Sequence, residues 1–457
     1  MKLPRIMLAA PASGSGKTMI TCGILQALQN REMKVKSFKC GPDYIDPMFH
    51  QQVLGTCSKN LDSFFTSEEI LRYLFAREAS KGTISILEGV MGYYDGAGGV
   101  TTTASSYELA KLTDTPVILI INAKGMSLSL IPLIQGFVRY EKDSHIKGVI
   151  LNQISAGTYH NMKEQIEKET DIKVIGYVPI CKEIAIESRY LGLMMPNEIA
   201  NLKEKLQKFA KILEETLQLD QLLEYASEAS EFTFQTPSCL KLPQNSKERA
   251  LRIGVAKDEA FCFLYQDNLE LLEEMGAELV YFSPLWEQQL PEKLDGLLFP
   301  GGYPELYLEQ LSENDSMKED VRHTIEQGTP YLAECGGFLY LLEELKDCSG
   351  TCYPMAGALK GTSHATKKLG KFGYITISPK NDNQILKKGE TIKGHEFHYF
   401  DTNANGTDYH GTKPFGNKKW DCMQGETFWA AGFPHLYYYS NPKFAYRFLE
   451  ECMERRK

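Results

Sequence analysis

The sequence lacks any apolar run long enough to cross a membrane, and its N-terminus runs into a glycine-rich loop rather than a signal-peptide cleavage site. It also lacks a basic excess, because the net charge of −9 offers no electrostatic footprint for nucleic acid. Internal repeats and low-complexity tracts are missing. The eleven cysteines are odd in number and scattered, unlike a disulfide framework. We therefore expect a cytoplasmic protein with reduced thiols that binds neither membranes nor nucleic acid.

The length and composition are those of a two-domain globular protein. The 457 residues exceed one ordinary core, and 43% of them are hydrophobic and 24% charged. The segment "SEASEFTFQTPSCLKLPQNSKERA" is polar and punctuated by prolines, as linkers are. We therefore predict domains at residues 1–226 and 250–457, joined by a linker at 227–249.

Short apolar runs alternate with helical periodicity in both halves, which predicts an α/β fold with mostly parallel sheets. Strands are expected at 5–9, 35–39, 83–87, 116–121, 147–151 and 173–177, and helices at 19–30 and 107–112. A charged amphipathic helix is expected at 201–226. A second α/β series begins at Leu251, and the later chain has strand-like stretches at 374–378 and 427–431.

The stretch "APASGSGKT", residues 10–18, lies between an expected strand and an expected helix, as a phosphate-binding loop requires. The strict pattern has glycine at the position of Pro11, so this chain departs from it. Backbone amides and the helix N-terminus would face the phosphates, and Lys17 would reach them. The alternative is a glycine-rich turn with an incidental Lys-Thr pair. The predicted nucleotide-binding residues are Gly14, Ser15, Gly16, Lys17 and Thr18.

Carboxylates follow two other expected strands, in "KCGPDYIDPMFH" and "ILEGVMGYYDGAGG". They are Asp43, Asp46, Glu88 and Asp95. Because ligands gather at the carboxyl ends of parallel strands, these loops should face one crevice. Mg²⁺ takes oxygen ligands, so we predict a metal site at Thr18, Asp46 and Glu88. Alternatively, Asp43 caps a helix and Asp95 forms a turn with Gly96.

Three further polar residues follow expected strands and have two interpretations each. Lys39 and Lys124 could contact phosphate or be ordinary surface lysines. Asn152 could contact adenine or cap a helix. The sequence leaves these alternatives open.

A second candidate site centres on "YLAECGGFLY", residues 331–340, which predicts a strand, a sharp turn and a helix. Cys335 at this turn would gain from the helix N-terminus, and the two glycines after it permit a tight elbow. Gly301 and Gly302 of "FPGG" could supply oxyanion-hole amides, and His435 could act as the base. The alternative is a packed thiol, which is how we interpret the other cysteines.

Seven motifs in order resemble the cobyrinic acid a,c-diamide synthase family over nearly the whole chain. They are "KCGPDYIDPMFH", "LEGVMGYYDG", "ESRYLGL", "VAKDEAFCFLYQDNLELL", "FPGGYPELY", "AECGGFLYL" and "GHEFHY". The resemblance implies a P-loop domain similar to dethiobiotin synthetase and a class I glutamine amidotransferase domain. It also implies that Mg²⁺ and ATP activate two carboxylates of a corrin as acyl phosphates, with L-glutamine as nitrogen donor. A homodimer is expected by analogy.

The resemblance also places individual residues. Substrate contacts would fall on Tyr44, Asp46, Glu88 and Asp95, the catalytic cysteine on Cys335 and its base on His435. The sequence departs from the family at Pro11, Asn122 and Tyr190. Many amidotransferases carry a glutamate two residues after the histidine, where this chain has Tyr437, so the group that orients His435 is open.

Several alternatives stay open. The tetrapyrrole could be nickel-sirohydrochlorin or hydrogenobyrinic acid. The chain could also be a P-loop switch or scaffold with an inactive amidotransferase domain, although Lys17, Cys335 and His435 are all present. His395 and His398 have metal-like spacing, but we prefer a scaffold or domain-interface role for "GHEFHY".

Overall fold

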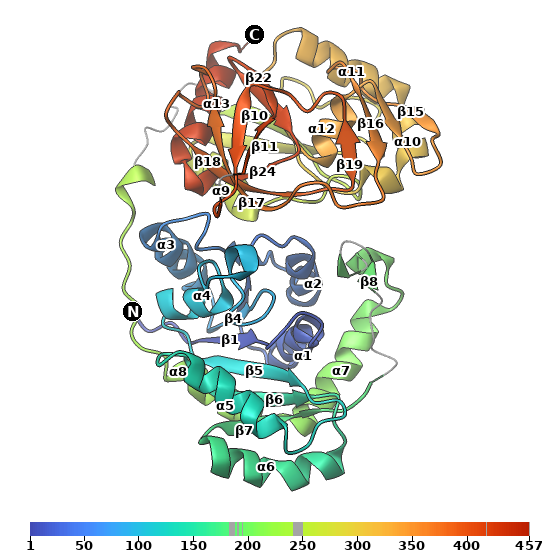
Figure 1. Cartoon of the computed structure of the whole chain (residues 1–457). Coiled ribbons are helices and arrows are strands. Elements are labelled where there is room, and N and C mark those ends of the chain that lie inside the picture. Colours follow the sequence, from blue (N-terminus) through green and yellow to red (C-terminus); the bar gives the residue numbers. More distant parts are fainter. Residues whose placement is uncertain (182–187, 190–191, 194, 241–249, 417, 457) are drawn as a thin grey trace. The chain divides into compact units, whose positions relative to one another are not determined.

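A computed structural model describes residues 1–181, 188–189, 192–193, 195–240, 250–416 and 418–456 (Figure 1). The chain forms two compact units, Met1–Pro237 and Ser238–Lys457. Residues 241–249 of the expected linker, and Tyr190, lie outside the described residues. The domain limits at 226 and 250 therefore stay a prediction.

The first unit is built on seven parallel strands in the order β3-β2-β4-β1-β5-β6-β7. The strands are β1 (Arg5–Ala9), β2 (Val35–Cys40), β3 (Lys59–Leu61), β4 (Ile84–Glu88), β5 (Val117–Asn122), β6 (Ile146–Asn152) and β7 (Lys173–Val178). The six expected strands are all present with ends within one residue, and only β3 was missed. Because β4 lies between β1 and β2, the loops that follow these three strands are neighbours.

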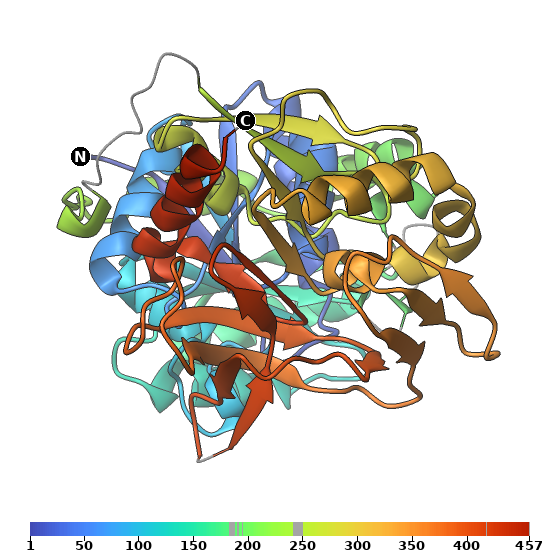
Figure 2. The same cartoon turned by 90° about the horizontal axis from the view of Figure 1, so that it is seen from above.

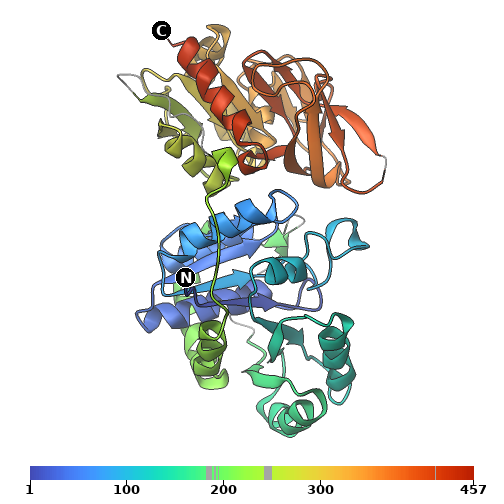
Figure 3. The same ribbon diagram turned by 90° about the vertical axis from the view of Figure 1, so that its left-hand side faces the viewer.

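Helices cover both faces of this sheet, as Figures 1 and 3 show. They are α1 (Lys17–Asn30), α2 (Ile45–Leu54), α3 (Glu68–Ala79), α4 (Ser106–Leu112), α5 (Leu130–Tyr140), α6 (Ala156–Thr170), α7 (Leu202–Thr216) and α8 (Leu219–Ser227). The single helix expected at 201–226 is wrong. The chain is extended at Leu217, which pairs with Gly176 of β7 and so divides the segment into α7 and α8.

The strands of the first unit are continuous apolar runs because of where they lie in its core. Both faces of the sheet are covered, so nearly every residue of β1, β4 and β5 is buried. Ser67, Ser105 and Ser155 each cap a helix by accepting a backbone hydrogen bond. Short additional elements are a hairpin of β8 (Ser188–Arg189) and β9 (Gly192–Leu193) and 3₁₀ helices at Ala97–Gly99 and Pro196–Glu198.

The second unit contains a six-stranded sheet in the order β11-β10-β12-β13-β23-β22, parallel except for its last pair. Its strands are β10 (Leu251–Ala256), β11 (Ala277–Phe282), β12 (Gly296–Phe299), β13 (Tyr331–Glu334), β22 (Gln424–Glu426) and β23 (Trp429–Gly432). Its helices are α9 (Gln266–Glu274), α10 (Leu308–Glu313), α11 (Asp315–Glu326), α12 (Gly336–Leu341) and α13 (Pro442–Glu454). The 3₁₀ helices lie at Ser238–Leu240, Pro304–Leu306 and Tyr438–Ser440.

Two smaller sheets complete the second unit, and Figure 2 shows their orange and red strands gathered beside the yellow parallel strands. One contains β14 (Glu344–Lys346), β15 (Cys352–Pro354), β16 (Thr362–Ala365) and β19 (Phe400–Thr402). The other contains β17 (Phe372–Pro379), β18 (Ile392–Phe397), β20 (Tyr409–Thr412), β21 (Lys419–Cys422) and β24 (His435–Tyr437). Within the described part of the chain, no helix has the length and hydrophobicity to span a membrane.

Candidate active sites

The phosphate loop connects β1 to α1, and its backbone depends on two glycines. Gly14 and Gly16 have φ angles of 76° and 92°, in the left-handed region that favours glycine. A Cβ on Gly16 would also collide with the Asn152 side chain. The Asn152 amide donates to the Ser15 carbonyl oxygen at 2.9 Å, so this residue holds the loop in shape. The prediction that Asn152 contacts adenine stays untested.

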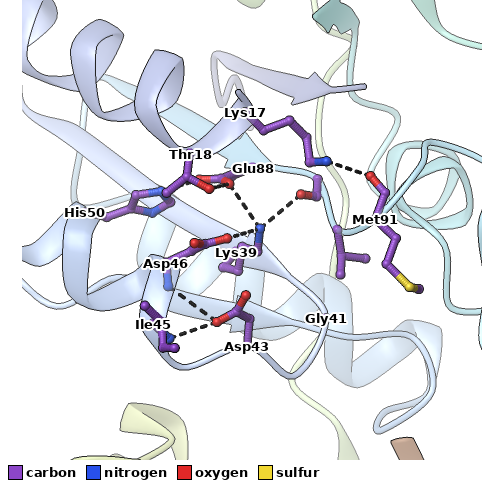
Figure 4. Close-up of polar contacts among 12 residues, drawn as sticks. Lys17, Thr18, Lys39, Gly41, Asp43, Ile45, Asp46, His50, Glu88 and Met91 are labelled. Carbon is purple, nitrogen blue, oxygen red and sulfur yellow. Dashed lines mark hydrogen bonds and ion pairs between the residues drawn. The ribbon is translucent and has the colours of Figure 1, made fainter. Parts of the chain in front are cut away.

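Lys17 begins α1 and lies buried over the loop. Its ammonium group donates to the Met91 carbonyl oxygen at 2.6 Å (Figure 4). It also donates to the Ala12 carbonyl oxygen at 3.4 Å. Burial, reinforced by the Lys39 charge, lowers the pKa of Lys17 to about 8. Neutral carbonyl groups therefore hold a cation that a phosphate group would stabilise more strongly.

Glu88 is the hub of a buried polar cluster beneath the loop. Its Oε1 accepts hydrogen bonds from the Thr18 hydroxyl at 2.8 Å and from the Lys39 ammonium at 3.1 Å. Its Oε2 lies 2.6 Å from Nε2 of His50 (Figure 4). Burial opposes ionisation of Glu88, but Lys39 and His50 outweigh it and lower the pKa of the carboxyl group. Glu88 is therefore a buried anion that is fully hydrogen-bonded.

Asp46 joins this cluster through Lys39, whose ammonium lies 2.5 Å from the Asp46 carboxylate. Burial and the neighbouring Asp43 carboxylate raise the pKa of Asp46, while Lys39 opposes the shift. Asp43 accepts hydrogen bonds from the backbone of Ile45 at 2.8 Å and of Asp46 at 3.4 Å. Asp43 thus fixes the start of α2, which positions Asp46. Tyr44, between these two aspartates, is buried as well.

Asp95 lies on the loop after β4 and has a local hydrogen bond. Its Oδ2 accepts from the Gly92 amide at 2.9 Å, which shapes the loop. It is also close enough for its charge to act on the pKa of Lys17. The structure therefore brings the predicted residues Lys17, Thr18, Asp46 and Glu88 together, with Asp95 at the border.

His50 is a member of this cluster that the sequence analysis missed. Its Nδ1 lies 3.2 Å from the Ser58 hydroxyl, which in turn donates to the Ser37 carbonyl oxygen at 3.1 Å. The signal was available, because His50 ends the motif "KCGPDYIDPMFH" five residues after Ile45, the first residue of α2. Lys39, predicted with an open alternative, is buried rather than a surface lysine.

The arrangement fits a magnesium-nucleotide complex. The Thr18 hydroxyl and the Glu88 carboxylate are already in contact at 2.8 Å, and both are oxygen ligands of the kind that Mg²⁺ prefers. The loop amides and Lys17 would hold the phosphates. Among the described residues of either unit, no group of three or more acidic, histidine and cysteine side chains could hold a metal ion by itself. The phosphates of the nucleotide would therefore have to supply further Mg²⁺ ligands.

Cys335 is held at a strained turn between β13 and α12. Its φ and ψ angles are 44° and −108°, which non-glycine residues rarely adopt. Its amide donates to the Gly432 carbonyl oxygen at 2.8 Å. We expected the helix N-terminus to favour the thiolate, but burial and the nearby Glu305 carboxylate raise the pKa of the thiol. Cys335 therefore needs a base to lose its proton.

The turn after β12 packs directly against this elbow. A Cβ on Gly337 would collide with the Phe299 carbonyl oxygen, and one on Gly336 would lie 3.1 Å from the Gly302 amide nitrogen. A Cβ on Gly301 would collide with the His435 ring. The absence of side chains at these positions thus lets the "FPGG" turn, the elbow and the histidine approach one another.

His435 begins β24, where it pairs with His395 of β18. Burial, together with the charges that His395 and His398 would carry, lowers the pKa of His435 to about 3. Its Nδ1 lies 4.0 Å from Oε2 of Glu334, the residue before Cys335, and burial raises the pKa of Glu334 to about 8. Glu334 was not among the predicted site residues, although it is adjacent to the proposed nucleophile.

Two protein-family models match this chain, one in its N-terminal part and one in its C-terminal part. Residues 6–191 match the CobQ/CobB/MinD/ParA nucleotide binding domain. Residues 252–427 match the CobB/CobQ-like glutamine amidotransferase domain. Each match contains one of the two candidate sites, apart from His435, which lies beyond the second match.

Several curated proteins are similar over almost the whole chain. A cobyrinate a,c-diamide synthase of Caldanaerobacter subterraneus subsp. tengcongensis is 40% identical, covering 98% of each chain. One of Clostridium acetobutylicum is 41% identical, covering 96% of this chain and 98% of the relative. One of Picrophilus torridus is 39% identical, covering 99% of both. The similarity therefore includes both units and the segment that joins them.

Proposed function

The chain belongs to the cobyrinate a,c-diamide synthase family, and we propose that it amidates the a and c carboxylates of cobyrinic acid with ATP and glutamine. The reaction is an ATP-dependent, glutamine-hydrolysing carbon–nitrogen ligation in cobalamin biosynthesis. The observation that supports it is the presence of two candidate sites in one chain. One is a phosphate loop with Glu88 against Thr18, and the other is a cysteine elbow and a histidine, His435, that both adjoin the "FPGG" turn.

In the first unit, the loop amides of residues 14–18 bind the ATP phosphates, and Lys17 exchanges its carbonyl partners for phosphate oxygens. Thr18 and Glu88 would hold Mg²⁺, and Asp46, which pairs with Lys39 in this structure, is the further candidate ligand. Bound Mg²⁺ supplies positive charge that stabilises the phosphates during transfer.

The corrin carboxylate is a poor electrophile because ammonia would have to displace oxide. Transfer of the ATP γ-phosphoryl group to the carboxylate forms an acyl phosphate, whose phosphate is a good leaving group. Tyr44 and Asp46 lie at the start of α2, after β2, and Asp95 lies on the loop after β4, the strand between β2 and β1. We assign substrate binding to these three residues. Asp46 or Asp95 accepts the proton that ammonia loses on attack.

In the second unit, Cys335 attacks the glutamine side-chain amide after its thiol proton passes to His435. The amides of Gly301 and Gly302 stabilise the oxyanion that forms on the amide carbonyl. Ammonia leaves, and water then releases glutamate from the cysteine. The ammonia must reach the acyl phosphate without protonation or dilution in bulk water.

The test follows product mass. The protein is incubated with Mg²⁺, ATP, glutamine and cobyrinic acid, and two successive amidations are expected, each replacing a carboxyl hydroxyl with an amino group. Parallel reactions contain hydrogenobyrinic acid or nickel-sirohydrochlorin. If one of these tetrapyrroles is amidated and cobyrinic acid is not, that tetrapyrrole is the substrate instead. No mass change with any tetrapyrrole would overturn the synthetase function. The predicted homodimer and cytoplasmic location stay predictions.

A further inference from the structure

The residue before the nucleophile occupies the position that an orienting group for the base would need. Glu334 ends β13 and is nearly buried, at 9% exposed, and its Oε2 lies 4.0 Å from Nδ1 of His435. Its Oε1 accepts a hydrogen bond from the Leu436 amide at 3.2 Å. One carboxylate thus contacts the backbone after His435 and faces the ring of the same residue.

The position two residues after the histidine does something else in this chain. The Tyr437 hydroxyl donates to the Asp267 carboxylate at 3.2 Å, which places it against α9. Its ring lies edge-on to Tyr265. Asn268, also on α9, donates to the Leu436 carbonyl oxygen at 2.7 Å and accepts from the Tyr438 amide at 2.8 Å. Helix α9 therefore fixes the backbone of residues 436–438, and Tyr437 contributes to this anchoring.

We propose that Glu334 is the positioning residue that orients His435 by accepting a hydrogen bond from Nδ1–H, which leaves Nε2 to take the Cys335 proton. This inference rests on the proposed glutamine hydrolysis. A cavity of about 20 Å³ borders Glu334 and Asn268, with room for about one water molecule. The 4.0 Å separation between Oε2 of Glu334 and Nδ1 of His435 has to shorten for this hydrogen bond to form. Such catalytic contacts often tighten when substrate binds.

The proton balance explains why a carboxylate is useful at this place. The thiol proton moves from Sγ of Cys335 to Nε2 of His435, the thiolate attacks the amide carbon of glutamine, and the imidazolium then gives the proton to the departing ammonia. The imidazolium is buried beside His395, so it needs an adjacent anion. Glu334 supplies this charge when it is ionised, and the positive imidazolium beside it favours the ionised form. The other titratable groups near Glu334 are Cys335 and Tyr438.

Four variants test this proposal: Glu334→Ala, Glu334→Gln, Tyr437→Phe and Asp267→Asn. Glutamine hydrolysis and ammonia-dependent amidation are measured for each. In Glu334→Ala we expect kcat for glutamine hydrolysis to fall by about 10²-fold, with the KM for glutamine within roughly threefold, because transition-state interactions rather than substrate binding are lost. Glu334→Gln should recover part of kcat, since its amide oxygen can accept from Nδ1–H but carries no charge.

The controls separate orientation from folding. Tyr437→Phe and Asp267→Asn should retain kcat within about threefold of the parent protein, since neither touches the His435 ring. Ammonia-dependent amidation should be unchanged in all four variants. Normal kcat in both Glu334 variants would overturn the proposal, as would an equal loss in Tyr437→Phe or a parallel loss of ammonia-dependent activity. If the parent protein itself does not hydrolyse glutamine, the proposed function fails first.

Discussion

The two candidate sites both lie at the carboxyl ends of parallel strands, but they differ in how far their charged groups are already paired. In the nucleotide site, Lys39, Glu88 and Asp46 form contacts of 2.5 to 3.1 Å within a buried cluster. In the amidotransferase site, burial favours the neutral forms of all three titratable groups. It raises the pKa values of Cys335 and Glu334 and lowers that of His435.

The difference reflects what each site receives. A nucleotide brings several negative charges, so the site holds cations and carboxylates ready and hydrogen-bonded before the ligand arrives. Glutamine brings an uncharged amide to Cys335, and the charges arise only when the thiol proton moves to His435. The nucleotide site is therefore organised by ion pairs, whereas the amidotransferase site is organised by backbone packing around glycines.

The largest expected effects distinguish the two sites by the nitrogen donor, glutamine or ammonium, that each variant can still use for amidation. Lys17→Ala should lower amidation with either glutamine or ammonium by about 10³-fold, because phosphate stabilisation serves both nitrogen donors. Cys335→Ala should abolish amidation with glutamine but leave amidation with ammonium at high concentration near the parent rate. The measurement is amide formation by mass spectrometry with each donor. Intact use of glutamine by Cys335→Ala would contradict the nucleophile assignment.

A smaller effect is expected from His50, which tests whether the ion-pair cluster is built for a metal. His50→Ala removes the group that fixes Oε2 of Glu88, and we expect magnesium affinity to fall by roughly 10-fold to 100-fold. The measurement is the Mg²⁺ dependence of binding a fluorescent ATP analogue, which requires no turnover. Metal-free analogue binding serves as a reference.

The control for this prediction is His160→Ala. His160 is exposed on α6, where its Nδ1 hydrogen-bonds the local Ala156 carbonyl oxygen and its ring lies edge-on to Tyr159. It should bind Mg²⁺ and the analogue like the parent protein. Equal magnesium dependence in His50→Ala and the parent would show that Glu88 does not need His50 to hold the metal.

Much of the first unit was predictable because its signals are local. The phosphate loop and the strands before Asp46 and Glu88 were identified from apolar runs that end at polar residues. The break between α7 and α8 was not, because Leu217 leaves the helix to pair with Gly176, a contact between distant segments. The same reason hid the roles of His50 and Glu334. Each acts through a side chain far away in the sequence, Glu88 or His435, so only the fold brings the partners together.

The smallest expected effect concerns folding stability. It tests whether the Glu334 carboxyl group is protonated, and so neutral, in the folded protein. Burial raises the pKa of Glu334 to about 8, whereas an unfolded glutamate has a pKa of about 4.3. The folded state therefore binds more protons than the unfolded state between these values, and folding stability falls as pH rises from about 5 to 8. Glu334→Gln cannot ionise and should escape this loss.

The variant should therefore melt at a progressively higher temperature than the parent protein as pH rises from 5 to 8. The difference in melting temperature should grow by about 2–4 °C for each kcal/mol of folding free energy that the parent loses and Glu334→Gln keeps. Glu313→Gln, at an exposed position on α10, is the matched control and should show a constant difference. A difference that is also constant for Glu334→Gln would mean that the carboxyl group ionises at its ordinary pKa. The amidotransferase site would then hold a preformed anion beside His435, and it would resemble the nucleotide site instead of contrasting with it.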